Sequence, residues 1–193
     1  MKKLLIFVLS ITTFTGKLQA EPYLGFRSAY FTFTDSNLRD VYDRGGIDFQ
    51  ICMAYPLWNW LQIYSSIEYS HKSGKSLNFD QSTRIKEFPA SIGLQGYFDL
   101  YSCVKYYVTI GPKYFWINVH NESDYVPKKL SANKCGGFIG TGFHLYLQDQ
   151  IFLDPFIEYS YVKIQLGNQK NNVVSNDVQA GGLVIGCGLG FKY

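Results

Sequence analysis

Apolar and polar residues alternate with a period of two along most of this chain, and this alternation limits the folds that it can adopt. In the segment 46–57, Ile47, Phe49 and Ile51 share one side, while Asp48 and Gln50 share the other. Successive side chains of a β-strand point to opposite faces, whereas the apolar residues of a helix recur every three or four positions. The alternation therefore predicts an all-β protein.

Eight segments show this pattern, and short and long connections alternate between them. We expect strands over residues 23–34, 46–57, 61–69, 85–98, 104–119, 136–147, 151–164 and 179–193. The long connections are 35–45, 72–84, 120–134 and 165–178. Short turns at one end and long loops at the other are typical of outer-membrane barrels, with the loops outside the cell. The pattern predicts an eight-stranded antiparallel up-and-down transmembrane β-barrel.

The first twenty residues have the organisation of an export leader. Lys2 and Lys3 precede an apolar run that is too short to span a bilayer, and a small-residue cleavage site ends at Ala20. We therefore predict a signal peptide over residues 1–20 and a barrel over residues 21–193. The leader carries three lysines and no acidic residue, so the formal charge of +3 falls to zero in the mature chain. No basic stripe interleaved with aromatics remains, which excludes nucleic acid as a partner.

The C-terminal segment carries a resemblance to a known family. Leu189, Phe191 and Tyr193 alternate with small or polar residues and end on an aromatic. This ending resembles the assembly signal of outer-membrane barrels, although Phe is commoner than Tyr at the last position. With the strand pattern, the mature chain resembles the small eight-stranded barrels of OmpX, OmpA and OmpW type. The resemblance implies location in the bacterial outer membrane, with its lipids and the barrel assembly machinery as partners.

If the apolar face meets lipid, the other face lines a lumen that side chains just fill. We predict a polar network there, plugged with the help of Tyr64, Tyr107 and Tyr146; its charged members are Arg27, Asp48, Glu68, Lys105, Lys113, His144, Glu158 and Lys192. Aromatic residues are enriched at both membrane interfaces of such barrels. The predicted girdle contains Trp58, Trp60, Tyr97, Trp116 and Tyr161.

Three prolines lie inside predicted strands, where each removes a donor from the hydrogen-bond ladder. They are Pro89, Pro112 and Pro155. A closed barrel has no free edge to accommodate them, so we expect bulges or shortened strands at these positions.

One constellation is a candidate for catalysis. His71 and Ser73, followed by Glu87, resemble the His-x-Ser of outer-membrane lipid A deacylases, in which a carboxylate orients the imidazole. The asparagine that usually follows that serine is absent, and in that family the motif lies near the C-terminus. We expect no catalytic residues, and no metal or cofactor.

The sequence therefore favours a non-enzymatic barrel with a structural or surface-interaction role. Its loops would contact an extracellular ligand or host surface, because recognition usually resides in loops on a rigid scaffold. The loop 120–134, with Tyr125, Lys128 and Lys129, is the best candidate for contact with anionic groups. Three alternatives stay open: a lipid A deacylase, a narrow channel for small solutes, and a secreted ligand-binding barrel of lipocalin type with its apolar face inside.

Overall fold

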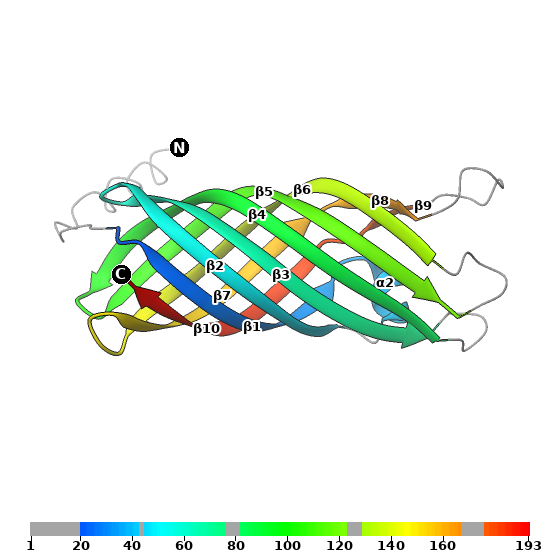
Figure 1. The fold of residues 1–193 in the computed structure, drawn as a ribbon, viewed down its shortest axis with the longest axis horizontal. Coiled ribbons are helices and arrows are strands. Elements are labelled where there is room, and N and C mark those ends of the chain that lie inside the picture. The colour runs from blue at the N-terminus through cyan, green and yellow to red at the C-terminus, as the bar shows by residue number, and fades with distance from the viewer. Residues whose placement is uncertain (1–19, 43–44, 76–81, 123–128, 167–175) are drawn as a thin grey trace, which may run out of the picture.

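The computed structural model describes residues 20–42, 45–75, 82–122, 129–166 and 176–193, which form one closed antiparallel barrel (Figure 1). The order around the wall is β1-β10-β7-β6-β5-β4-β3-β2. The wall strands are β1 (Tyr23–Phe33), β2 (Gly46–Trp58), β3 (Leu61–Lys75), β4 (Ser82–Tyr101), β5 (Val104–Asn121), β6 (Lys129–Tyr146), β7 (Ile151–Tyr161) and β10 (Gly182–Lys192). The predicted fold is confirmed.

The apolar face of the wall points outward. Phe26 is 57% exposed and Ile67 is 67% exposed, whereas their polar neighbours Arg27 and Glu68 are buried inside. An exposed apolar surface that surrounds the whole barrel suits a lipid environment and no aqueous one. The lipocalin-type alternative, which needs the apolar face inside, is therefore excluded.

The two ends of the barrel differ (Figure 1). Short turns connect β2 to β3, β4 to β5 and β6 to β7 at the end where the C-terminus lies. At this end the amide of Ala20 donates to the carbonyl of Asn59 at 2.6 Å, and that of Lys192 donates to Gln150 at 2.8 Å. Residues 1–19 of the predicted leader, which spans residues 1–20, lie outside the described part of the chain.

The outer end contains structure that the alternation did not predict. A short helix, α2 (Ser36–Val41), follows β1, and β8 (Lys163–Leu166) pairs with β9 (Asn176–Gln179) as a separate two-stranded sheet. Strands β3 to β6 also continue into the segments 72–84 and 120–134, parts of which were expected to be loops. Among the described residues, no helix is long and apolar enough to cross a membrane.

The prolines interrupt the ladders without shifting the register, so the predicted bulges and shortened strands are wrong. Pro89 pairs with Phe115 in the β4–β5 ladder, and Pro112 pairs with Gly137 in the β5–β6 ladder. Next to each proline, the ladder on its other side skips two residue pairs and resumes in the same register. Because each proline loses its donor toward one neighbour only, the strand remains continuous.

The lumen changes character along the barrel axis. Its outer third is apolar, with buried side chains from β1, β4 and β5 that pack against Leu38 and Tyr42 at α2; they include Phe31, Phe33, Ile85, Phe115, Ile117 and Val119. Burial raises the pKa of Tyr42, whose hydroxyl lies 3.3 Å from that of Thr83. The prediction of a polar interior therefore fails at this end, where the lumen is a small hydrophobic core beneath a helical cap.

Candidate functional site

On the periplasmic side of the apolar outer part, the lumen is crossed by a network centred on Arg27. Its Nε donates to Asp154 at 2.6 Å, and its terminal nitrogens donate to Gln50, Tyr64 and Tyr107 at 2.9, 2.8 and 3.0 Å. These partners come from four strands, β2, β3, β5 and β7, so the guanidinium joins walls that are far apart in the sequence. A planar guanidinium offers five donors, which suits this convergence. Asp154 and Gln50 were not among the predicted network residues.

A second cluster lies one level closer to the outer end, around Lys113. Its ammonium group lies 2.5 Å from a carboxylate oxygen of Glu68 and 2.5 Å from one of Glu158, and all three side chains are buried. Glu68 also accepts hydrogen bonds from Gln50 and Ser66. The triad links β3, β5 and β7 across the lumen. Together with the Arg27 network it crosses the lumen between the periplasmic mouth and the apolar outer part.

Lys72 occupies the boundary between the polar and apolar parts of the lumen. Its ammonium group lies 3.2 Å from the ring centroid of Phe31 and 3.8 Å from that of Phe33, an arrangement that favours a cation over aromatic faces. Within the described residues its Nζ has no hydrogen-bond partner. The buried carboxylates Asp48 and Glu87 each keep one oxygen without such a partner as well. Of these three residues, only Asp48 was predicted to belong to the network.

The remaining predicted network residues lie nearer the periplasmic end. Lys105 and Lys192 reach Glu21 at 3.7 and 2.9 Å, so they belong to the mouth of the barrel. His144 is buried and stacks on Phe152 with ring centroids 3.9 Å apart. The imidazole Nε2 lies 3.9 Å from a carboxylate oxygen of Asp154. The structure thus separates the predicted network into a mouth, an Arg27 cluster, a Lys113 cluster and the boundary group around Lys72, to which Asp48 belongs.

The structure places four of the five predicted girdle residues on the outer surface. Trp58, Trp60, Trp116 and Tyr161 are all exposed. Tyr97 is instead 4% exposed, and its hydroxyl donates to Gln95 inside the lumen at 2.9 Å. The alternation of β4 already put Tyr97 on the face of Gln95, so residue type was the wrong criterion there. The predicted assembly residues of β10 and the terminus point outward: Leu189, Phe191 and Tyr193.

The three candidate catalytic residues are not brought together. His71 and Ser73 are exposed on the outward face of β3, while Glu87 on β4 is buried in the lumen. Glu87 instead accepts a hydrogen bond from Ser70 at 3.3 Å. A carboxylate on the opposite face of the wall cannot orient the imidazole of His71, so this triad has no geometric basis. Among the described residues, no group of His, Cys, Asp and Glu side chains could hold a metal ion.

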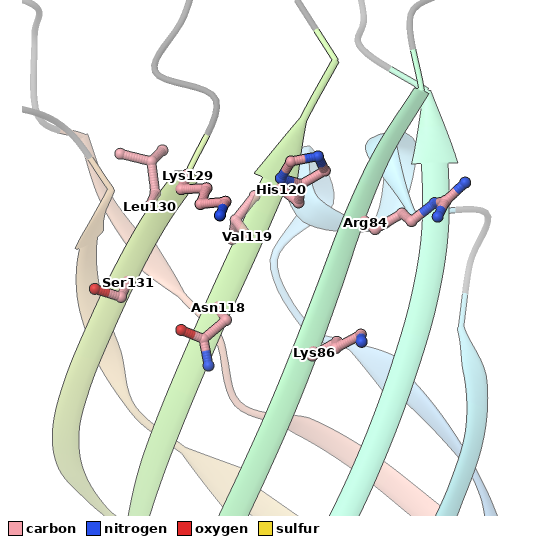
Figure 2. Close-up of a pocket in the computed structure, with 8 residues that line it drawn as sticks. All are labelled: Arg84, Lys86, Asn118, Val119, His120, Lys129, Leu130 and Ser131. Carbon is pink, nitrogen blue, oxygen red and sulfur yellow. The ribbon is translucent and has the colours of Figure 1, made fainter.

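A basic groove lies on the outer surface near the extracellular end (Figure 2). It has a volume of about 430 Å³ and spans β4, β5 and β6; its lining residues are Arg84, Lys86, Asn118, Val119, His120, Lys129, Leu130 and Ser131. Lys129 belongs to the loop that was predicted to contact anionic groups; Tyr125 and Lys128 lie outside the described residues. Sequence reasoning missed the groove because it treated Arg84, His120 and Lys129 as loop residues, although they alternate with apolar residues like the rest of the wall.

The comparisons with known proteins agree with this architecture. The model of the OmpW family matches residues 62–193. This chain belongs to the OmpW family. The match includes β3 and every later wall strand, and therefore most of the lumen clusters and the whole basic groove. No curated protein sequence matches the chain.

Similar solved structures come from several bacteria. The outer membrane protein OprG of Pseudomonas aeruginosa has a TM-score of 0.67 at 16% identity, and the alignment covers 91% of this chain and 97% of OprG. Neisserial surface protein A has a TM-score of 0.58 at 16% identity, covering 90% and 98%. Ail of Yersinia pestis, in complex with the heparin analogue sucrose octasulfate, has a TM-score of 0.56 at 16% identity, covering 90% and 99%. Identities this low establish a shared fold, and family and fold place the protein in the bacterial outer membrane.

Proposed function

We propose that this OmpW-family barrel is a closed, non-enzymatic anchor whose outer end binds an anionic extracellular ligand. The observation that carries the proposal is the filled lumen. Arg27 and Lys113 join strands on different sides of the barrel through ion pairs of 2.5–2.6 Å, and the α2 cap packs on an apolar core above them. An interior of eight strands is narrow enough for such side chains to fill it.

The outer end supports the binding part of the proposal. Arg84 and Lys86 project from β4 and Lys129 projects from β6, on the side of the wall that faces away from the lumen, with β5 between them. Ail, which shares the fold, is known in complex with a heparin analogue. Charge-assisted hydrogen bonds from arginine and lysine to sulfate or phosphate are among the stronger polar contacts. A polyanion is therefore the ligand class that suits this surface.

Conductance of the refolded protein in a planar bilayer tests the closed lumen. We expect no ion steps from the wild type. The Arg27→Ser variant should stay closed as well, because the Lys113 triad and the apolar core beneath α2 remain in place. A wild-type protein that conducts steadily would make a narrow channel the better description.

Binding of sucrose octasulfate to the detergent-refolded protein tests the outer end. We expect binding that weakens as salt is raised, because exposed charges are screened within about 8 Å at physiological ionic strength. Absence of binding at low salt would remove the anionic-ligand part of the proposal and leave a purely structural barrel.

A test of hydrolysis addresses the enzymatic alternative directly. We expect no release of acyl chains from lipid A by the wild type, and the same null result for Ser73→Ala. Release that disappears in Ser73→Ala while the protein remains folded would reinstate the deacylase.

A further inference from the structure

The cations of the basic groove are arranged in two rows across adjacent strands. Arg84 pairs with His120, and His120 pairs with Lys129, so these three form one row over β4, β5 and β6. Lys86, Asn118 and Ser131 form the row directly below. Neighbouring strands lie about 4.8 Å apart, so each row spans about 10 Å. The groove thus offers two rows of donors to an anion at the surface of the wall (Figure 2).

An aromatic row lies immediately beneath the donors. Phe88 pairs with Trp116, two residues below Lys86 and Asn118, and both rings are exposed on the outward face. Tyr69 of β3 adds a third ring, with its centroid 5.0 Å from that of Phe88. Aromatic rings of this kind mark the membrane interface. With strands tilted by about 40°, two residues along a strand rise by about 5 Å. This rise places the row of Lys86 and Asn118 at the level of the lipid headgroups.

The charge of the groove is barely compensated within the protein. Arg84 lies 4.0 Å from Glu122, and both side chains are more than half exposed, so this pair is weak. In the described part of the chain, Lys86 and Lys129 have no acidic partner. His71 of β3 pairs with Lys86 in the β3–β4 ladder and adds a polar donor at the edge of the groove. Surface cations that have no strong acidic partner in the protein attract an external anion.

We propose that the groove binds the phosphorylated headgroup of a lipid in the outer leaflet of the same membrane. These side chains point sideways from the wall, directly above exposed rings, so an anion that carries acyl chains can contact both the cations and the rings, whereas a soluble polyanion would contact only the cations. A headgroup held by Arg84, Lys86 and Lys129 would place its attached chains along Phe88 and Trp116. The volume of about 430 Å³ is in the range of small-molecule sites.

This inference deepens the proposed function, because it names the chemical class and the source of one anionic partner, and it rests on the interaction role of the outer end. It does not depend on a closed lumen. Conductance of the wild type would therefore refute the closed barrel without affecting the lipid site. Conversely, binding of sucrose octasulfate without binding of a phosphorylated lipid would leave the proposed function intact and remove the inference.

The test is native mass spectrometry of the refolded protein in detergent with added lipid A or with its dephosphorylated form. The groove variant is Arg84→Gln/Lys86→Gln/Lys129→Gln. The matched control is Arg39→Gln/Lys134→Gln/Lys163→Gln, which removes three exposed cations near the outer end but outside the groove lining. The shift in gel mobility between heated and unheated samples verifies that each variant is folded.

We expect retention of phosphorylated lipid A by the wild type and the control, and roughly 100-fold weaker retention by the groove variant, since each of the three basic residues near an anionic lipid surface contributes about fivefold. Dephosphorylated lipid should not be retained by any form. Equal retention by the wild type and the groove variant would overturn the proposal. An equal loss in the control would also overturn it, because general attraction would then account for binding. Retention of the dephosphorylated lipid would do the same, because the acyl chains would then be sufficient.

Discussion

Replacing Lys113 by methionine should strongly destabilise the barrel. The substitution keeps most of the apolar volume but leaves Glu68 and Glu158 buried without the cation that each contacts at 2.5 Å. Glu68 would keep the hydrogen bonds from Gln50 and Ser66, so most of the cost falls on Glu158. Removing one partner of a buried ion pair typically costs about 3–5 kcal/mol, and we expect Lys113→Met to lie in that range.

The assay is equilibrium unfolding in urea of the protein refolded into detergent, followed by tryptophan fluorescence. With a slope of about 2 kcal/mol per molar urea, the predicted loss lowers the midpoint by about 2 M. The matched control is Glu68→Gln/Lys113→Met/Glu158→Gln, which removes the whole triad and should recover most of the loss, because no uncompensated charge remains. A loss below about 1 kcal/mol for Lys113→Met would refute this reasoning, since it would mean that water already solvates the two carboxylates.

Three further predictions concern the rest of the barrel. Arg27→Ala should lower the free energy of unfolding by at least about 3 kcal/mol in the same urea assay, because it removes the cation that lies 2.6 Å from the buried carboxylate of Asp154. Unchanged stability would show that water solvates this carboxylate. Gly190→Ala should cost about 1–3 kcal/mol, because a Cβ there would lie 2.0 Å from the Phe152 ring, and unchanged stability would mean that the ring moves freely. A water-soluble maleimide should label Cys103 in its exposed turn and not the buried Cys52 until urea unfolds the protein; rapid labelling of Cys52 in the folded state would contradict a filled lumen.

The alternation was sufficient to predict all eight wall strands and the direction of nearly every side chain on them. The face of Lys113 and Glu158, for example, follows from counting residues along each strand. Counting also places Asp154 inside, but it does not say that Asp154 lies opposite Arg27. That contact depends on the stagger between strands around the closed barrel, which is a property of the assembled sheet and leaves no local pattern in any one strand.

The apolar outer lumen did leave a pattern that the sequence reasoning passed over. Along β5, apolar residues occupy the outward positions up to Trp116, and from Phe115 onward apolar residues occupy the inward ones as well, namely Phe115, Ile117 and Val119. The change shows that the interior becomes apolar toward the outer end while the register continues. The short helix α2 had no comparable signal, because six residues are too few for a helical period to be recognised.

The formal charge of the chain conceals how its charges are sorted. Among the described residues, five buried carboxylates share the lumen with three buried cations; the carboxylates are Asp48, Glu68, Glu87, Asp154 and Glu158. The lumen is therefore acidic overall although residues 21–193 are formally neutral, so the residues of the barrel outside the lumen carry a positive surplus. Part of that surplus lies in the groove beside the outer aromatic rings. In the lumen, Arg27 and Lys113 form ion pairs with buried carboxylates, whereas in the described part of the groove Lys86 and Lys129 have no acidic partner, and this is why we propose binding at the outer wall and closure in the lumen.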